Sequence, residues 1–253
     1  MRKNLEEAHL QLVQSEKIAS VGRMAAGVAH EINNPMSGIL IYAELLRDEL
    51  KNSPQQQSDV QEIIDQTHRC KKIVSDLLEF SRQSVGRVST FNVEEMMQKS
   101  LNLLINQALF QNIKITFEIE PEIPEMIGDM GQLQQVFTNL FINAADAMDG
   151  KGHLDINVFF NPEKNQFTII VTDSGPGIPE GLKGKIFDIF FTTKPVGKGT
   201  GLGLSISRNI INLHGGNIIV ECPQGGGTQF IIELPLGFVD QPPDEPIFVG
   251  MDE

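Results

Sequence analysis

Residues 190–206 read FFTTKPVGKGTGLGLSI, in which four glycines alternate with other residues directly ahead of an apolar helical pattern. Glycine lets backbone amides approach an anion closely and adopts dihedral angles that other residues resist. A helix that follows adds unpaired N–H groups and a partial positive charge at its start. The run therefore predicts a segment that binds phosphate.

Two familiar phosphate-binding patterns do not fit this run. The dinucleotide spacing G-x-G-x-x-G fails because Leu204 stands where the third glycine is required. The P-loop pattern fails because no Gly-Lys pair in the chain is followed by Ser or Thr. A flexible glycine linker is the plain alternative, but apolar residues follow at helical spacing from Leu202 to Leu213 and argue against it. The sequence favours a phosphate site of another type.

Composition gives the 253-residue chain room for one large domain or two smaller ones, with 40% hydrophobic and 21% charged residues. No apolar stretch approaches the ~18 residues that span a membrane, and no secretory signal opens the sequence. Cys70 and Cys222 are too few for a disulfide framework or a zinc cluster, which fits a reducing cytosol. We expect a cytoplasmic protein without membrane contact by these residues, so any membrane attachment would lie outside them.

The net charge of −13 argues against nucleic acid as a partner. Four lysines nevertheless gather beside the glycine run, where Asp188 is the only acid: Lys183, Lys185, Lys194 and Lys198. A polyanionic nucleotide requires such a local positive patch. A solvated charged loop is the alternative, which the neighbouring glycines disfavour.

Residues 5–82 predict two long helices, because apolar residues recur there at spacings of three and four. Pro35 should kink the first helix, and the polar stretch Lys51–Ser58 should form the turn. Two helices alone cannot bury such stripes, whereas a hairpin paired with a second copy makes a four-helix bundle. The pattern therefore favours a homodimer.

Beyond a hinge at residues 82–90 the pattern becomes mixed α/β. Asn92 and Glu95 form a capping box for a helix to about Leu109, and Asp129 can cap a helix to about Met148. His214 precedes two glycines at an expected helix end, which favours a capping role over catalysis. Strands are predicted at Ile113–Ile119, His153–Phe160, Phe167–Thr172, Asn217–Glu221 and Gln229–Leu234.

His30 and Glu31 stand in mid-helix, within the segment HEINNP that ends at Pro35. His30 falls outside the apolar stripes, so it can face solvent, where a histidine is most often a plain surface residue that titrates near neutrality. Here a carboxylate follows at once. A carboxylate that orients one imidazole nitrogen leaves the other nitrogen as a nucleophile, which makes His30 a candidate.

Two further polar clusters lie in the α/β half. Asn139 and Asn143 are four residues apart on a predicted helix and so share a face, either as ordinary polar residues or as part of a metal site. The segment DSGPG, from Asp173 to Gly177, follows directly on a predicted strand. A β-turn explains its glycines, but it does not explain the second glycine cluster that follows soon afterwards.

Taken in order, these motifs resemble those of a sensor histidine kinase of the two-component type, over about residues 12–236. The TTK…GTGLGL form resembles kinases of the nitrogen-regulator group. The matching segments are the phosphoacceptor box at His30–Pro35, the asparagine box at Asn139–Ala144, the first glycine box at Asp173–Gly177, the phenylalanine box at Phe187–Phe191 and the second glycine box at Gly197–Gly203.

A few positions depart from the family pattern. Ser174 replaces a common asparagine, and Asp146 replaces a frequent lysine, arginine or glutamine. Asp188 and Ile189 stand where the family usually has glutamate and proline. These departures are peripheral to the reaction: they bear on the behaviour of the lid and on ATP affinity, and the implied reaction class is unchanged.

The resemblance implies a fold and a division into domains. Residues 1–84 would form a coiled-coil entry and a dimerisation and histidine-phosphotransfer domain, a helical hairpin that makes a dimeric four-helix bundle. Residues 88–237 would form the catalytic ATP-binding domain, an α/β two-layer sandwich of the Bergerat (GHKL) type. Residues 238–253 would form an acidic tail, whose end resembles the opening strand and acidic pair of a receiver domain and would make the tail a linker into one.

The resemblance also implies ATP and Mg²⁺ as cofactors. Asp173 would accept a hydrogen bond from the adenine amino group, Asn143 would coordinate Mg²⁺, and Asn139 would lie near the phosphates. His30 would attack the γ-phosphate in line, while Glu31 orients it and accepts its proton. The other residues implied at the nucleotide are Gly175, Gly177, Lys194, Lys198, Gly199, Thr200, Gly201, Leu202 and Gly203.

The implied partner is the receiver domain of a response regulator, where an aspartate would take the phosphate from His30. Asn34 matches the family position that orients water to dephosphorylate the regulator; a solvent-facing amide ahead of a proline is the plain alternative. Two other classes stay open, a GHKL-type nucleotide-binding scaffold or ATPase without histidine phosphotransfer, and a serine kinase of the anti-sigma type. The histidine-bearing hairpin speaks against both.

Overall fold

The computed structural model describes residues 32–50, 53–195, 199–223 and 225–237, except residues 81–85 and the side chains of residues 76–80. Within these ranges the chain groups into two compact units, one made of residues up to 80 together with 177–213, the other of residues 86–176 together with 214–237. His30, Glu31 and Lys198 lie outside the described residues, so their predicted roles stay predictions.

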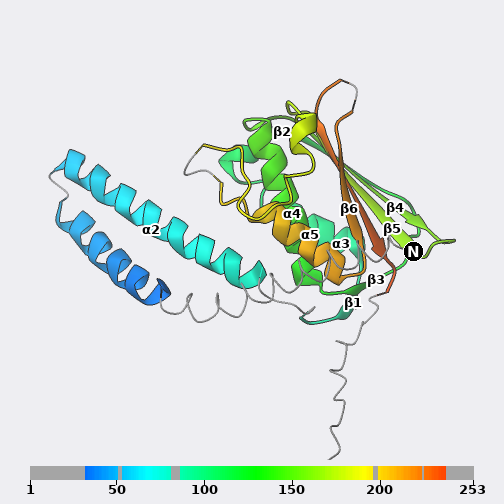
Figure 1. Cartoon of the computed structure of the whole chain (residues 1–253), viewed down its shortest axis with the longest axis horizontal. Helices are drawn as coiled ribbons and strands as arrows, with labels where there is room; N and C mark the ends of the chain where they lie inside the picture. The colour runs from blue at the N-terminus through cyan, green and yellow to red at the C-terminus, as the bar shows by residue number, and fades with distance from the viewer. Residues whose placement is uncertain (1–31, 51–52, 81–85, 196–198, 224, 238–253) are drawn as a thin grey trace, which may run out of the picture. The chain divides into compact units, whose positions relative to one another are not determined.

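A helical hairpin makes up part of the first unit (Figure 1). Its first helix is described over residues 32–49, and α2 runs over Pro54–Phe80. Ala43, Val60 and Ile64 are buried between the two helices, and Arg47 Nη1 donates to Gln61 Oε1 at 3.1 Å. The predicted hairpin is therefore confirmed.

The predicted turn of the hairpin was too long. It was expected to reach Ser58, whereas α2 already begins at Pro54. The amide of Gln57 donates to the Ser53 carbonyl at 2.9 Å. Proline suits the first position of a helix, because the N–H that it lacks would have no partner there.

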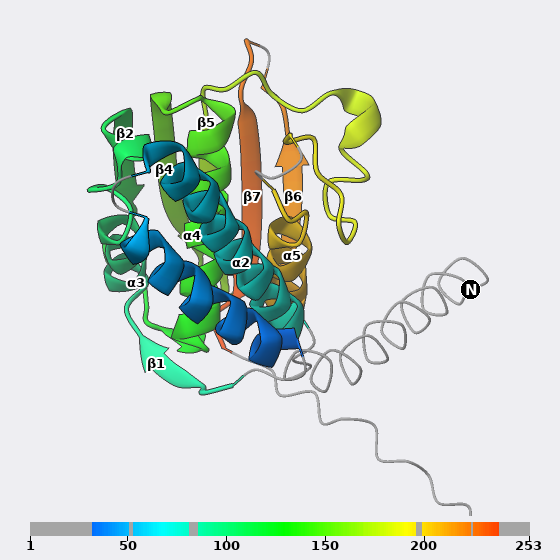
Figure 2. The same ribbon diagram turned by 90° about the vertical axis from the view of Figure 1, so that its left-hand side faces the viewer.

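A five-stranded sheet forms one layer of the second unit, in the order β2-β4-β5-β7-β6 that Figure 2 shows. β2 pairs with β4 in parallel, and the other pairs are antiparallel. The five predicted strands are confirmed, each observed strand containing its predicted range. Their bounds are Asn112–Ile119 for β2, Lys151–Asn161 for β4, Gln166–Asp173 for β5, Asn217–Glu221 for β6 and Thr228–Pro235 for β7.

Two helices of the same unit, α3 (Val93–Asn102) and α4 (Met130–Ala147), form the second layer. Alternate residues of the central strands are buried, as Leu154, Ile156 and Val158 of β4 show, which is the pattern of a sheet covered on one face. The expected α/β two-layer sandwich is thus confirmed. β1 (Ser89–Phe91) and β3 (Met126–Gly128) add a short antiparallel pair that the sequence did not predict.

The predicted cap residues Asn92 and Asp129 are confirmed, whereas the Glu95 side chain of the expected capping box pairs with Lys99 at 2.6 Å. Asn92 Oδ1 accepts from the amide of Glu95 at 3.1 Å, and Asp129 Oδ1 accepts from two amides at the start of α4. The expected end of α3 near Leu109 was wrong, because the helix stops at Asn102 and a 3-10 turn, η1 (Ala108–Phe110), follows separately. Asparagines in this stretch are poor helix formers.

The remaining described part of the first unit, residues 177–213, holds the 3-10 turn η2 (Glu180–Leu182) and helix α5 (Gly203–Leu213). α5 begins at Gly203, the last glycine of the run, where the sequence predicted a helix to follow. Among the helices that the structure describes, none is long and apolar enough to span a membrane.

Candidate functional site

Asp173 is a buried carboxylate at the end of β5, with 5% of its surface exposed. Its Oδ1 accepts hydrogen bonds from the amide of Gly175 at 2.8 Å and from the amide of Thr228 at 3.3 Å. Burial raises the pKa of Asp173, and the hydrogen bonds from Gly175 and Thr228 oppose the rise without cancelling it. A carboxylate held in this way is a fixed acceptor that favours a neutral or positive donor.

The turn after β5 requires glycine at position 175. A Cβ there would lie 2.8 Å from Asp173 Oδ1 and 3.3 Å from the carbonyl oxygen of Ala147, the last residue of α4. Glycine therefore lets the turn pack against the end of α4, which is the helix that carries the predicted asparagines. The predicted residues Asp173 and Gly175 are brought together.

The loop between β6 and β7 completes this end of the sheet. Gly227 has φ +90°, and a Cβ on it would collide with the carbonyl oxygen of Asp173. Its amide donates to the carbonyl of Gly175 at 2.9 Å. Thr228, which the sequence analysis missed, thereby reaches the Asp173 carboxylate; three consecutive glycines, residues 225–227, directly ahead of a strand were the signal that could have found it.

Asn139 and Asn143 lie on one face of α4, as their spacing predicted. Asn143 Nδ2 approaches Asn139 Oδ1 at 3.5 Å, and both side chains are half-buried. One turn earlier, the side-chain oxygen Oε1 of Gln135 is buried, and no donor among the described residues reaches it. Amide oxygens of this kind are suitable ligands for a hard divalent cation.

The described part of the glycine run belongs to the other unit and is held by its own contacts. Gly201 has φ +67°, and a Cβ on it would collide with the backbone of Phe190, itself a non-glycine residue with φ +66°. The amide of Leu202 donates to Thr200 Oγ1 at 3.3 Å, and the Leu202 side chain is fully buried. The run is therefore anchored at Gly201 and Leu202 rather than being a free linker.

Of the four lysines predicted beside the run, the structure describes Lys183, Lys185 and Lys194. Lys183 Nζ forms an ion pair with Glu180 Oε2 at 2.6 Å, so part of its charge is compensated. Arg208 of α5 stacks over the Phe187 ring at 5.0 Å from the centroid. Lys194 remains next to the run, where its amide donates to Thr192 Oγ1 at 3.1 Å.

His214 has a structural task in the second unit. Gly215 has φ +71°, which confirms the predicted helix end. The imidazole is buried, and its Nε2 accepts from the amide of Asp129 at 3.0 Å. His214 therefore joins the start of α4 to the chain ahead of β6, a role that differs from the expected cap.

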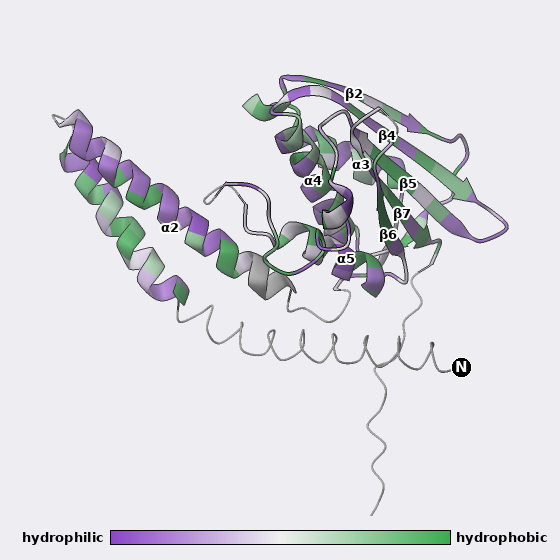
Figure 3. Cartoon of the chain, turned by 45° about the horizontal axis from the view of Figure 1, so that its top comes forward, coloured by the Kyte–Doolittle hydropathy of each residue, from purple (hydrophilic) through white to green (hydrophobic). Residues whose placement is uncertain are grey.

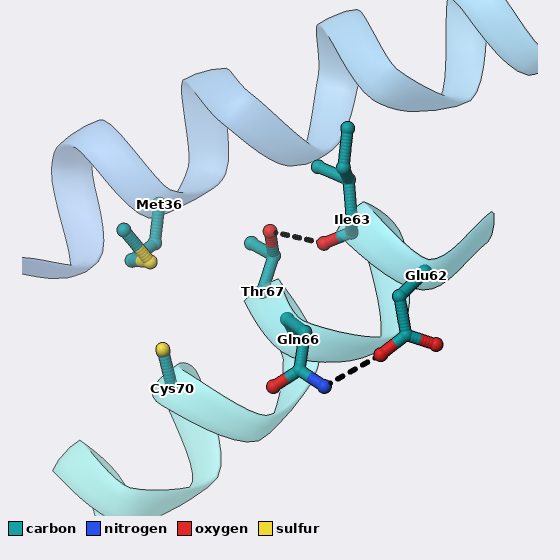
Figure 4. A pocket seen from close by; sticks show the side chains of 6 residues that line it. All are labelled: Met36, Glu62, Ile63, Gln66, Thr67 and Cys70. Atoms are coloured by element: carbon teal, nitrogen blue, oxygen red, sulfur yellow. Dashed lines mark hydrogen bonds between the residues drawn. The ribbon is translucent and has the colours of Figure 1, made fainter. Parts of the chain in front are cut away.

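On the hairpin, Asn34 is the one predicted phosphoacceptor-box site residue that lies within the described part of the chain, and it is exposed. A shallow apolar hollow of about 250 Å³ is lined by Met36 of the first helix and by residues of α2 (Figure 4). Thr67 bonds back to the Ile63 carbonyl there. The hollow is lined by Met36, Glu62, Ile63, Gln66, Thr67 and Cys70.

Two family models match the chain. Residues 20–86 match the "His Kinase A (phospho-acceptor) domain", and residues 128–237 match the "Histidine kinase-, DNA gyrase B-, and HSP90-like ATPase". The first match contains His30 and Asn34, and the second contains Asn139, Asn143 and Asp173.

Curated relatives agree with these matches. The signal transduction histidine-protein kinase AtoS of Escherichia coli K12 is 33% identical over 91% of this chain and 37% of its own length. The sensor kinase CckA of Brucella abortus is 34% identical over 89% of this chain and 25% of its own length. The sensor histidine kinase ZraS of Salmonella typhimurium is 33% identical over 91% of this chain and 50% of its own length. This chain thus spans a quarter to a half of these relatives.

Solved structures give the same answer. Histidine kinase ThkA, solved in complex with response regulator protein TrrA, is 32% identical with a TM-score of 0.65, over 92% of this chain and 67% of that chain. Full-length ShkA in complex with AMPPNP shares the fold, with a TM-score of 0.72 at 24% identity, over 86% of this chain and 46% of that chain. The chain belongs to the sensor histidine kinase family, and residues 128–237 are its ATP-binding domain. The nitrogen-regulator subgroup stays a prediction.

Proposed function

We propose that this chain is the kinase core of a two-component sensor, which moves the γ-phosphate of ATP to His30 and then to an aspartate of a response regulator. The observation that carries the proposal is the union, on one chain, of a phosphoacceptor domain match around His30 and an ATPase domain with a buried, glycine-framed carboxylate at Asp173. An ATPase without a phosphoacceptor lacks the first of these.

In this proposal the Asp173 carboxylate recognises adenine by accepting a hydrogen bond from its amino group. A buried carboxylate that already holds two backbone amides through Oδ1 is fixed in orientation, and the adenine amino group is a donor that suits it. Thr228 supports the carboxylate through its own hydrogen bonds. Gly175 and Gly177 allow the close approach of the backbone at the turn after β5.

Asn143 and Asn139 are proposed to act at the phosphates of ATP. Mg²⁺ commonly takes one or two protein oxygen ligands together with substrate phosphates. The side-chain oxygen of Asn143 would be such a ligand, and the Asn139 side chain lies next to that of Asn143. When bound, Mg²⁺ supplies charge neutralisation for the transferring phosphate. An amide at position 139 does not activate water as a carboxylate does, which favours transfer over hydrolysis.

The glycine run and its lysines would hold the triphosphate. Gly199, Thr200, Gly201, Leu202 and Gly203 offer backbone amides ahead of α5. Lys194 and Lys198 add positive charge. In the reaction, a His30 ring nitrogen forms a bond to the γ-phosphorus while the bond to the bridging β-oxygen breaks, ADP leaves, and Glu31 takes the imidazole proton.

The hairpin would pair with a second copy to form a dimeric four-helix bundle. Its first helix exposes large side chains, among them Tyr42 with 75% and Leu45 with 56% of their surfaces exposed. Green, hydrophobic residues recur along this helix in Figure 3. A single hairpin leaves these side chains in water. A second copy of the hairpin carries the same apolar surface, so the two surfaces would cover each other in the bundle.

The phosphate acceptor is proposed to be the receiver domain of a response regulator. ThkA, the relative described above, was solved in complex with a response regulator protein. On this chain Asn34, which is exposed and follows His30 by four positions in the sequence, would orient water for removal of the phosphate from the regulator.

The decisive test follows the phosphate. With γ-labelled ATP and Mg²⁺, we expect acid-labile label on the wild-type chain and none on His30→Gln. His68→Gln is the matched control, because His68 is an exposed histidine on α2 outside the motif. Equal labelling of the His30→Gln protein would reject histidine transfer to this residue, and steady ATP turnover without labelled protein would favour the plain ATPase.

A further inference from the structure

Ser174, the residue directly after Asp173, uses its side chain to tie down the end of β5. Its Oγ accepts from the amide of His153 at 2.9 Å and donates to Met148 Sδ at 3.4 Å. Its own amide donates to the His153 carbonyl at 3.1 Å. Ser174 and His153 are therefore joined by hydrogen bonds in both directions.

These bonds extend the pairing of β4 and β5 beyond its last regular pair. The ladder ends where Leu154 lies opposite Asp173. The next amide along β4, that of His153, would have no strand partner there, and the Ser174 hydroxyl supplies the acceptor. On its other side Asp173 is paired with Thr228 of β7. The carboxylate-bearing residue is thus held from both neighbouring strands.

The same hydroxyl also reaches helix α4. Met148 is the C-cap residue of α4 and is buried. Gly152 leaves the room for this contact, because a Cβ on it would lie 2.5 Å from Ser174 Oγ and 2.6 Å from Met148 Sδ. Helix α4 carries Asn139 and Asn143, so Ser174 connects the base-reading residue to the helix that carries the proposed Mg²⁺ ligand.

We propose that Ser174 is a positioning residue for nucleotide recognition, one that fixes the Asp173 carboxylate where it meets the adenine amino group. The inference rests on the proposed function, since it assumes that Asp173 binds the base. A serine serves here because its short hydroxyl bridges a backbone amide and a buried sulfur, which distinguishes this chain from the asparagine common in the family.

The test compares two nucleotides that differ only at the group Asp173 is proposed to read. Dissociation constants are measured by calorimetry for ATP and for purine riboside triphosphate, which has hydrogen in place of the amino group. For Ser174→Ala we expect ATP binding to weaken about three- to tenfold, the effect of one lost hydrogen bond, while binding of the analogue stays the same. The preference of the wild type for ATP should shrink accordingly.

Two further variants separate positioning from general stability. Ser174→Thr keeps the hydroxyl and should restore the preference for ATP. Thr172→Ala removes a hydroxyl two residues before Ser174 that accepts a hydrogen bond from Gln229 and lies on the face of the sheet opposite Asp173, so it should leave the preference unchanged. Circular dichroism and the melting temperature establish that each variant is folded.

Equal weakening of both nucleotides by Ser174→Ala, or no weakening of either, would overturn the inference. A Ser174→Thr protein that behaves like Ser174→Ala would do the same, because the hydroxyl would then not be the active group. A wild type that binds ATP and the analogue equally would instead reject base reading by Asp173, and with it this part of the proposed function.

Discussion

At the scale of single residues, Asp173 shows a conflict between folding and binding. Its burial raises the pKa, so the ionised form that the ligand needs is the form that the fold disfavours. A group whose pKa is raised on folding stabilises the folded state in its protonated form, and this contribution is lost as the pH rises through the folded pKa. The residue proposed to bind adenine therefore lowers the folding stability of the nucleotide-free protein at neutral pH.

The substitution Asp173→Asn separates these two effects. We expect the variant to bind ATP at least about tenfold more weakly, because a charge-assisted hydrogen bond is lost. Without nucleotide, the melting temperature of the variant relative to wild type should rise as the pH is raised from the ordinary aspartate range through the raised pKa, and then stay constant. Thermal unfolding over a pH series measures this, and a difference independent of pH would contradict it.

Prediction at this scale depended on motifs. Asp173, Asn139 and Asn143 stand in short patterns that a reader of the sequence can find, and the structure brings Asp173 and Gly175 into direct contact. Thr228 comes from 55 positions further along the chain. Only the pairing of β5 with β7 brings it to Asp173, and strand order is not written in local sequence.

At the scale of elements, the glycine run is held at Gly201. Both Gly201 and Phe190 have positive φ, and the two backbones lie too close for a side chain between them. Non-glycine residues in this conformation cost about 1–2 kcal/mol. Phe190 carries this cost and Gly201 does not, and burial of the Leu202 side chain next to Gly201 helps to offset it.

Gly201→Ala tests the importance of this anchor. We expect the variant to lose about 1 kcal/mol or more of unfolding free energy, because it adds a strained φ and a collision with Phe190. ATP binding should weaken as well, because the run can no longer rest against Phe190. Chemical denaturation and calorimetry measure the two effects.

Gly181→Ala is the control for that experiment. Gly181 lies in the same unit, but it has open space where a Cβ would be added. The control should bind ATP as the wild type does. A Gly201→Ala protein indistinguishable from this control would show that the close approach to Phe190 has no role in holding the run.

Elements were predictable where side chains alternate or a cap is present, and less so elsewhere. β5 and β7 alternate buried and half-buried residues over their whole length, so the sequence revealed them. β1 and β3 have three residues each, too few for any period to show. The parallel pairing of β2 with β4 could not be read from either strand, since it depends on the crossover through α4.

At the scale of the whole molecule, the exposed apolar surface of the hairpin predicts self-association. Leu45→Asp places a charge on this surface, and burying a charge in an apolar interface costs several kcal/mol. We expect the dimer dissociation constant to rise at least about tenfold, as measured by sedimentation equilibrium. Gln56→Asp adds the same charge at an exposed polar position of α2 and should leave the dimer intact. Equal effects of the two substitutions would place the interface elsewhere.

The backbone hydrogen bond from Gly227 to Gly175 determines where a reporter of ATP binding can be attached. Gly225 has open space around it, whereas Gly227, two residues later, is locked against Asp173. A side chain at Gly225 would strain the backbone at φ +131° but meet no neighbour, whereas one at Gly227 would also collide with the Asp173 carbonyl. We therefore expect a reporter dye or a short inserted tag to be tolerated better at Gly225 than at Gly227. Attached at Gly225, the reporter would lie two residues before Gly227, whose amide donates to the Gly175 carbonyl beside Asp173, which makes this loop a suitable place for an optical sensor of ATP.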